Sequence, residues 1–428
     1  MRKIATLFLL FSCCTLAAQP LVVTENREQP RSAIVPYATA DEAAKAPAQH
    51  RYGAQIETWT QEGSSFKATF TVPFAWNNRQ VVMRIAHASA DYEVWINGRR
   101  AATNADGNSS ADFNLTRLVK EGRNEVEIRL ADPSSMAVIE SWKEQLKPAL
   151  GAVQLVSPPT MGVRELLVQT HRHDTTYRAE IGVVVKSYAL NPRTVRIYYD
   201  LLTPAGELLS TGHNDLTLRM RGEDTVRFLA QVPDTLLWSR ERPQQCVIRL
   251  RTQRDGRYME YHHYPVGLRS VETADGTLMI NGDAVTLRSA EVAPTATAEE
   301  LQSLVAAGTN LVCLKTGAVA PHLLTTCDEL GLYVVVQAPI DSRKGGEKRT
   351  KGGNPSNDPA WTASYVERVE NCYHTTKHHP SVVGFSIARE SANGIGLYES
   401  YLRLKQFDDP RPILYPEAAG EWNNDAIR

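Results

Sequence analysis

The sequence predicts a multidomain protein of the β plus α/β class, with two all-β domains followed by an α/β domain. Three observations lead to this prediction. Short runs of alternating apolar and polar residues fill residues 56–156. A second set of short strands, bounded by turn residues, follows from 162 to 267. Beyond residue 268 strand patterns alternate with helical patterns, which is typical of βα units around a parallel sheet.

The composition is that of an ordinary globular protein with several domains. The chain has 428 residues, of which 42% are hydrophobic and 22% are charged. Its formal net charge is −1, and no long basic face stands out in the sequence. We therefore expect no nucleic acid among its partners.

The first 18 residues have the pattern of a secretory signal peptide. Positive charges precede an apolar run at 4–16, and small residues precede an expected cleavage after Ala18. The run is too short to span a membrane. We therefore expect export to the periplasm or the extracellular space. A lipoprotein signal that would leave Cys13 acylated is the less favoured interpretation, because Phe11 fits such a signal poorly.

The remaining four cysteines show no CxxC spacing and no histidine at ligand distance. They are Cys246, Cys313, Cys327 and Cys372. Disulfides are open to an exported chain, but sparse buried thiols are the favoured interpretation. The sequence predicts no cofactor and no metal site.

The first domain is expected at 19–157 and begins with a lead-in segment at 19–50 that lacks periodicity. Alternating runs at 66–72 and 80–85 predict strands. Asn97-Gly98 follows another such run and is the strongest short signal for a β-hairpin.

The second domain is expected at 158–268. About seven short strands in roughly 105 residues predict an immunoglobulin-like sandwich. The clearest strand patterns lie at 180–186, 194–202, 225–231 and 246–252.

The third domain is expected at 269–428. A hairpin at 278–285 leads into strands at 286–290, 310–315, 332–337, 382–387 and 412–415. Helical patterns lie at 297–307, before Gly331, at 361–377 and at 396–407.

The fourth of these strands, at 382–387, is followed by a carboxylate, Glu390. Enzymes with parallel sheets place their chemistry beyond the carboxyl ends of the strands. An acid in such a position is more commonly a helix cap or a solvated loop residue. The position of Glu390 alone therefore does not establish a catalytic role.

The run HHPSVVGFSIARESANG at 378–394 resembles the acid/base segment of glycoside hydrolase family 2, which includes β-galactosidases and β-glucuronidases. Residues 19–157 resemble the jelly-roll sugar-binding domain of that family. Segments 237–243 and 266–269 resemble its middle domain. The resemblance implies that 269–428 form a partial (β/α)8 TIM barrel and that the ligand is a carbohydrate.

The resemblance also implies roles for individual residues. Glu390 would be the proton donor, and Arg389 and Asn393 would contribute to substrate binding. The family carries Asn before the donor, where this chain has Arg389, a fixed cation with a different reach. The nucleophile is unknown, because a retaining pair needs a second carboxyl about 5–5.5 Å away. Glu417 and Glu421 follow the fifth predicted strand on the correct side.

Three loops that contact sugar in the family lack their polar groups in this chain. Only Glu291 remains after the first strand, the run GAVAP stands at 317–321, and Gln337-Ala338-Pro339 replaces the Glu-Ala-Asn of the family. Sugar sites depend on such groups for orientation and selectivity. Two hypotheses stay open: a β-galactosidase-like hydrolase of β-glycosides, and a catalytically silent relative that acts as an exported glycan- or protein-binding module.

The third domain has five predicted strands, whereas a closed barrel has eight βα units. An open parallel edge needs a cover, so we expect a homodimer or a partner chain there, unless the reading frame is truncated.

Two further features have two interpretations each. The basic, glycine-rich loop at 342–353 is either solvated or a cradle for an anion. His374 and His378 have a spacing that suits a metal, but exposed histidines at a helix end are favoured.

Overall fold

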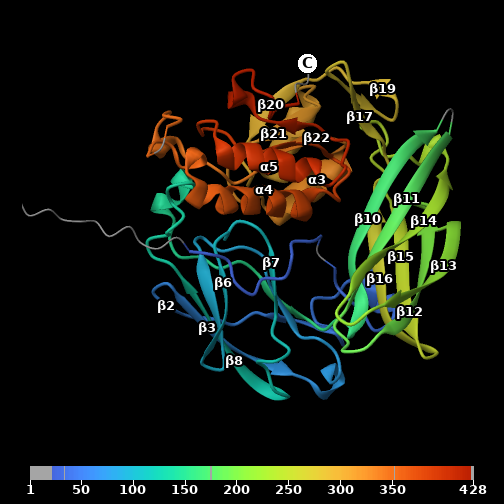
Figure 1. The fold of residues 1–428 in the computed structure, drawn as a ribbon. Helices are drawn as coiled ribbons and strands as arrows, with labels where there is room; N and C mark the ends of the chain where they lie inside the picture. Colours follow the sequence, from blue (N-terminus) through green and yellow to red (C-terminus); the bar gives the residue numbers. More distant parts are fainter. Residues whose placement is uncertain (1–21, 33, 174–175, 351, 426–428) are drawn as a thin grey trace, which may run out of the picture.

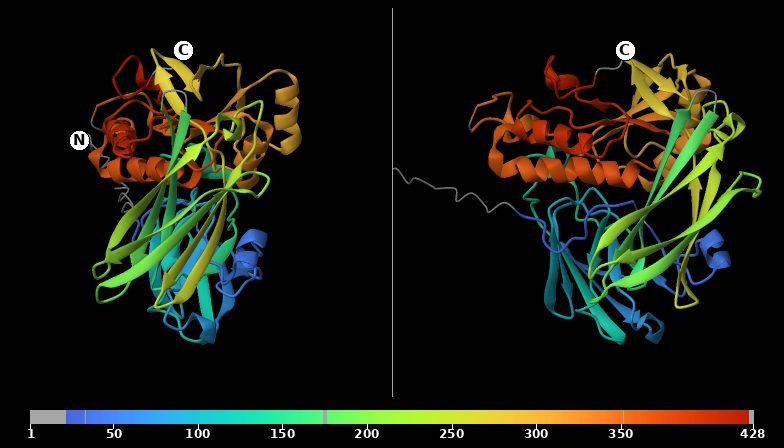
Figure 2. Two further views of the ribbon diagram at one scale, coloured as in Figure 1. Left: turned by 90° about the vertical axis from the view of Figure 1, so that its right-hand side faces the viewer. Right: turned by 45° about the vertical axis from the view of Figure 1, so that its right-hand side comes forward.

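The computed structural model describes residues 22–32, 34–173, 176–350 and 352–425. The signal peptide expected at 1–18, including Cys13, lies outside the described residues. Two β-sandwiches and an α/β unit pack against one another: the first sandwich lies below the α/β unit in Figure 1, and the second sandwich lies alongside both (Figures 1 and 2). No helix among the described residues combines the length and the apolar character needed to cross a bilayer.

The first sandwich consists of two antiparallel sheets with strand orders β1-β9-β4-β7 and β2-β3-β8-β5-β6. The hairpin predicted at Asn97-Gly98 is present, and both residues have the positive φ that its turn requires. Side chains alternate between core and solvent, as Val126 and Ile128 of β8 illustrate. The strands are β1 (Gly53–Ile56), β2 (Thr60–Glu62), β3 (Ser65–Val72), β4 (Val82–Ile85), β5 (Tyr92–Ile96), β6 (Arg99–Asn104), β7 (Ala111–Asn114), β8 (Gly122–Leu130) and β9 (Val153–Val156).

The second sandwich has seven strands, the number expected from the sequence, in sheets β10-β11-β14 and β13-β12-β15-β16. Its separate core includes Ile181, Ile197 and Ile248. The strands are β10 (Met161–His173), β11 (Thr176–Ser187), β12 (Arg193–Leu202), β13 (Leu208–Leu218), β14 (Glu223–Val232), β15 (Cys246–Arg254) and β16 (Arg257–Val266).

The lead-in segment at 19–50 contacts both sandwiches. Its sequence, which lacks periodicity, did not predict these contacts. Glu25 forms a β-bridge with Thr103 of the first sandwich, and Tyr37 forms one with Tyr261 of the second. A short helix, α1 (Ala40–Lys45), follows and is capped by the side chain of Thr39.

The α/β unit contains a five-stranded parallel sheet in the order β20-β21-β22-β23-β24, with one helix after each of the first four strands. The five predicted strands and four predicted helices are all present. A three-stranded antiparallel sheet precedes them. The elements are β17 (Val271–Ala274), β18 (Thr277–Ile280), β19 (Asp283–Ala284), β20 (Ser289–Val292), α2 (Ala298–Ala306), β21 (Leu311–Leu314), α3 (Pro321–Leu330), β22 (Tyr333–Gln337), α4 (Thr362–Thr376), β23 (Val382–Ser386), α5 (Ile395–Lys405) and β24 (Ile413–Leu414).

The first strand of this sheet begins three residues later than the predicted range of 286–290. The side chain of Asn310 explains the shift: its amide donates to the Thr286 carbonyl at 2.8 Å and accepts from the Arg288 N–H at 2.7 Å. An amide side chain therefore replaces the strand pairing at 286–288.

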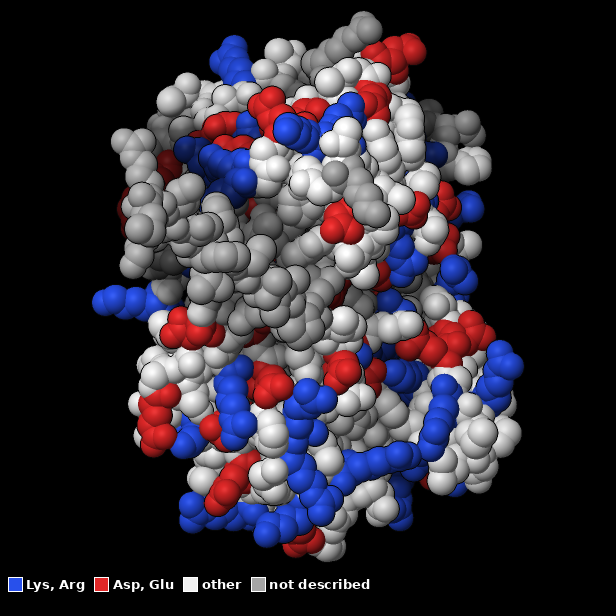
Figure 3. All heavy atoms as spheres, turned by 60° about the vertical axis from the view of Figure 1, so that its left-hand side comes forward, with Lys and Arg blue, Asp and Glu red and all other residues white. Residues whose placement is uncertain are grey.

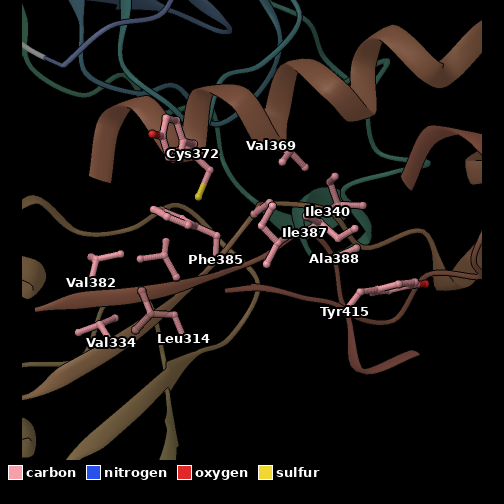
Figure 4. Close-up of a cluster of buried hydrophobic side chains, with 14 of the residues drawn as sticks. Leu314, Val334, Ile340, Val369, Cys372, Val382, Phe385, Ile387, Ala388 and Tyr415 are labelled. Atoms are coloured by element: carbon pink, nitrogen blue, oxygen red, sulfur yellow. The ribbon is translucent and has the colours of Figure 1, made fainter. Parts of the chain in front are cut away.

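Each face of the parallel sheet has its own cover. On the helix side, Phe385 and Ile387 pack with Val369 and Cys372 of α4, as Figure 4 shows. On the other side, Trp238 from the end of the second sandwich packs with Leu311, Tyr333 and Val383.

A later segment of the same chain lies along the edge of the sheet at β24. Ile413 N–H donates to the Asp425 carboxylate at 2.9 Å, and Asp425 N–H donates to the Ile413 carbonyl at 2.8 Å. Tyr415 N–H donates to the Asn424 side chain at 2.7 Å. At the other edge, no strand among the described residues pairs with the outer side of β20. A second copy or a partner there stays a prediction.

A buried charge cluster joins α4 to the first sandwich. Arg368 donates to the Glu140 carboxylate at 2.7 Å and to the Ala105 carbonyl at 2.9 Å. Asn371, one turn further along α4, donates to Asp106 at 2.7 Å. These contacts fix the α/β unit on the first sandwich.

Candidate functional site

The carboxyl ends of the parallel strands bring charged side chains from four segments to one edge of the sheet. We call this region the carboxyl edge. Because all five strands run in the same direction, residues far apart in the sequence meet there. We define it by the charged residues Glu291, Asp341, Arg343, Arg389, Glu390 and Glu417.

Glu390 lies at the carboxyl edge and forms an ion pair with Arg343. Asp341, which is buried, holds this guanidinium through contacts of 2.9 Å to Nε and 2.6 Å to Nη2. Glu390 has a φ of 57°, a left-handed conformation that residues other than glycine adopt at an energetic cost and that is frequent at functional sites. The surrounding chain thus fixes both partners of the ion pair.

This ion pair has a chemical consequence for the role that the resemblance assigns to Glu390. Contact with a guanidinium stabilises the ionised form of a carboxyl group. A general acid must start in its protonated form. The ion pair therefore occupies the carboxylate to which the resemblance assigns proton donation, and that role stays a prediction.

Arg389 points to a different partner from that of its neighbour. Its guanidinium forms an ion pair with Glu291 of β20, and both side chains are partly exposed. The contact links the end of β23 to the first strand of the sheet, across two intervening strands. The Arg389 side chain thus reaches across the carboxyl ends of two strands, farther than the shorter asparagine side chain of the family would extend.

Asn393 makes structural contacts. The residue is 4% exposed, and its amide exchanges two hydrogen bonds with the amide of Asn423, at 3.0 and 2.9 Å. This pair fastens the segment that covers β24. A role for Asn393 in substrate binding stays a prediction.

Of the two acids that follow the fifth strand, only Glu417 approaches Glu390. Its Oε1 lies 3.5 Å from the backbone nitrogen of Glu390, and partial burial raises the pKa of the Glu417 carboxyl. Glu421 instead accepts hydrogen bonds from Arg349 and from the hydroxyl of Tyr398. Glu417 is therefore the acid after the fifth strand that could pair with Glu390.

The basic loop at 342–353 is tied to the carboxyl edge through two of its arginines. Arg343 contacts Asp341 and Glu390, as described above. Arg349 donates to the Asn393 carbonyl at 2.9 Å and to Glu421 at 2.5 Å. Both arginines remain exposed, as a solvated loop predicts, and they also tie the loop to the carboxyl edge.

The prediction of exposed histidines was wrong for His374, which is buried where α4 meets the second sandwich. Its Nδ1 lies 3.6 Å from Glu165 and 3.1 Å from the Lys377 ammonium, and burial lowers its pKa. His378 is exposed. Within the part of the chain that the structure describes, no three or more His, Cys, Asp or Glu side chains are grouped to hold a metal ion.

The four cysteines beyond the signal are free thiols, and all except Cys313 are buried.

Two cavities lie away from the carboxyl edge. One of about 840 Å³ lies beside the start of the parallel strands and is lined by Arg172, Arg240 and Tyr333, among others. Another of about 760 Å³ lies on the first sandwich, beside Thr69 and Trp95. Neither is lined by a charged residue of the carboxyl edge.

A parallel sheet with a helix after each strand defines the third unit as part of a (β/α) barrel, a class that carries its chemistry at the carboxyl ends of its strands. Comparison with known families agrees: residues 301–427 match the profile described as "Glycosyl hydrolases family 2, TIM barrel domain". Residues 301–427 are thus similar to the TIM-barrel domain of glycoside hydrolase family 2.

Individual relatives support the same assignment. The chain is 25% identical over 416 residues to a β-galactosidase of Psychromonas ingrahamii, covering 91% of this chain and 38% of the relative. It is 27% identical over 370 residues to a β-galactosidase of Alteromonas mediterranea, covering 82% and 35%. The chain thus spans less than two fifths of the length of these curated relatives.

Among solved structures, the chain has the fold of a glycosyl hydrolase family 2 member from Bacteroides cellulosilyticus. The TM-score is 0.67 at 17% identity, and the match covers 82% of this chain and 49% of that one.

Proposed function

We propose that this chain binds β-linked carbohydrate at its carboxyl edge and that the described residues do not hydrolyse it on their own. The observation that carries the proposal is the ion pair between Glu390 and Arg343. It occupies the carboxylate that the family resemblance assigns as proton donor. By the same resemblance, we infer that the first sandwich is the jelly-roll sugar-binding-like domain and the second is the immunoglobulin-like domain.

The second carboxyl also supports a silent site. A retaining glycosidase needs two carboxyl groups about 5–5.5 Å apart on either side of the glycosidic bond. Glu417 is directed at the backbone N–H of Glu390. Neither Glu390 nor Glu417 lines one of the large cavities described above. The two acids thus do not face each other across either of these cavities.

The loops that follow the second and third strands support the same conclusion. Val319 and Ala320 pack against the core of the α/β unit. Gln337 is buried, and its amide donates to the Ala338 carbonyl. These segments therefore offer few polar groups with which to orient a sugar in the reacting geometry.

Partly exposed charges at the carboxyl edge support binding. The side chains of Arg343 and Glu390 are 55% and 45% exposed, and Arg389 is also accessible. Guanidinium groups donate hydrogen bonds and carboxylates accept them, which suits the hydroxyl groups of a sugar. Each of these groups has a protein partner that a ligand can replace.

Binding can be tested by titrating the purified chain with methyl β-galactoside, methyl β-glucuronide and methyl β-mannoside, followed by calorimetry or ligand-observed NMR. We expect Arg389→Gln and Arg343→Gln to weaken binding about five- to tenfold, the loss of one charged hydrogen bond. Arg403→Gln is the matched control, because Arg403 pairs with Glu370 on the helices. Absence of binding to all three sugars, or an equal loss in the control, would contradict the proposal. Binding to another exported protein instead would favour the protein-binding alternative.

Hydrolysis of β-glycosides is the second candidate function, and one observation favours it. Burial raises the pKa of Glu417, whereas Arg343 stabilises the ionised form of Glu390. Acid/base pairs need two carboxyls held in opposite protonation states. If Glu417 were the acid, turnover would vanish in both Glu417→Gln and Glu390→Gln and would decline as the pH rises.

Export is also part of the proposal, on the signal pattern of the first 18 residues. Fractionation of expressing cells, with a Cys13→Ser variant, separates a released protein from a lipid-anchored one.

A further inference from the structure

One end of the first sandwich carries a cluster of cations and an exposed aromatic ring. We call it the basic end and define it as Phe74, Arg99, Arg117, Lys120 and Arg123. Figure 3 shows Lys and Arg side chains gathered over the lower end of the molecule, on this sandwich. The basic end belongs to a different domain from the carboxyl edge, so it goes beyond the function proposed above.

Three chain segments meet at the basic end and are fixed to one another. The side chain of Asn97, in the β5–β6 turn, donates to the Leu118 carbonyl at 3.1 Å and to the Asn124 side chain at 2.9 Å. Asn124 in turn donates to the Lys120 carbonyl at 2.7 Å. Asn77, in the turn after β3, donates to Glu121 at 3.3 Å. The backbone that carries the cations is thus held by side-chain amides.

The four cations are exposed. Among the described residues, none of their side chains makes a hydrogen bond or an ion pair, whereas Arg129 on the same sheet pairs with Glu127. Two acids, Glu121 and Glu125, lie among them. Four cations against two acids leave an excess of positive charge. A surface of this kind attracts anions.

Phe74 adds an apolar surface to this charged cluster. At 74% exposed, it is the most exposed large apolar side chain among the described residues. Pairing of Val72 with Gly122 places Phe74 beside the start of β8, where Arg123 lies. Sugar rings present C–H faces that pack on an exposed aromatic ring.

We propose that the basic end binds an acidic polysaccharide that carries uronate or sulfate groups. Three of the four cations are arginines, whose planar forks match carboxylate and sulfate oxygens. The side-chain amides of Asn77, Asn97 and Asn124 fix the backbone that carries these cations. An anionic membrane fits less well, because interfacial binding needs an apolar face and only one large apolar side chain projects here.

The test compares binding of the full chain to polygalacturonate, dextran sulfate and uncharged dextran at low and high salt. We expect binding to at least one of the two polyanions, weaker as salt rises, and none to dextran. The triple variant Arg117→Gln/Lys120→Gln/Arg123→Gln should bind about tenfold more weakly. Phe74→Ala should reduce affinity about threefold at both salt concentrations, because its contact is apolar.

The matched control is Arg219→Gln/Arg221→Gln/Arg257→Gln, which removes the same charge from exposed positions of the second sandwich. It should bind like the unchanged chain. An equal loss of affinity in the control would show that binding depends only on the net charge of the protein, and would overturn the proposal. The proposal would also be overturned if the chain bound neither polyanion. A chain that bound only to vesicles containing phosphatidylglycerol, tested in parallel, would overturn it as well. Circular dichroism melts establish that each variant is folded.

Discussion

Two charge clusters of this molecule contain the same residue types but differ in what they can do. Between α4 and the first sandwich, Arg368 and Glu140 are both 0% exposed. At the carboxyl edge, Arg343 and Glu390 form the same kind of pair while about half of each side chain faces solvent. The clusters thus differ in burial far more than in chemistry.

Burial decides what each pair can do. The guanidinium of Arg368 also donates to two backbone carbonyls, those of Ser364 and Ala105, so its hydrogen bonds are used up inside the protein. Such a network holds two domains in one arrangement and cannot meet a ligand. The exposed pair at the carboxyl edge remains open to exchange partners, which is what a binding site requires. Charge pairs at the end of a strand should therefore be judged by exposure before a role is assigned.

The largest expected effect comes from breaking the buried pair. Arg368→Met removes the guanidinium from the buried carboxylates of Asp106 and Glu140 and leaves Glu140 paired with Lys143 alone, so we expect the free energy of unfolding to fall by about 3–5 kcal/mol. Urea denaturation followed by circular dichroism measures the change. A loss below about 1 kcal/mol would mean that the cluster is not what holds the domains together.

Acid should weaken the contacts around α4. Burial alone would raise the pKa of Glu165, but the hydrogen bond from His374 and the charge of Lys377 outweigh it and lower the pKa to about 2. The pKa of Asp409 is likewise about 2, because burial is outweighed by Arg411. Their ordinary values of 4.5 and 3.8 apply to the unfolded chain. The stability that they contribute, about 2–3 kcal/mol each, is therefore present above those values and is lost as the pH falls toward 2.

Urea denaturation at several pH values between 7 and 3 measures this dependence. Glu165→Gln should flatten the curve in the acid range relative to the unchanged chain. A curve of unchanged slope in that variant would remove Glu165 from the explanation.

The smallest expected effect is on the exposed pair. Arg343→Gln should change the free energy of unfolding by less than about 1 kcal/mol, because solvent screens a half-exposed pair. A double-mutant cycle with Glu390→Gln measures the coupling directly. A coupling energy as large as that of the buried pair would contradict the difference between the buried and the exposed pair.

Local patterns predicted most of the fold. The turn at Asn97-Gly98, the capping box that starts at Thr297 and the left-handed Gly331 after α3 are each specified by neighbouring residues. The five strands of the parallel sheet were predictable because buried strands form short apolar runs. Within one element, periodicity carries the necessary information.

The contacts between elements could not be predicted in this way. Glu140 and Arg368 lie 228 positions apart, and their pairing depends on how α4 docks on the first sandwich. His374 has the spacing of an exposed helix end, yet docking of the second sandwich buries it. The pairing of Arg343 with Glu390 depends on the path of a long loop. The contact between Asp341 and Arg343, by contrast, is local, because the two residues lie two positions apart.

The most direct test of the central claim is turnover of chromogenic β-galactoside, β-glucuronide and β-mannoside by the purified chain, beside its Glu390→Gln variant. An ion-paired Glu390 that does not donate a proton predicts the same background rate for both proteins on all three substrates. Hydrolysis by the unchanged chain that disappears in the variant would contradict the claim and establish an active glycosidase.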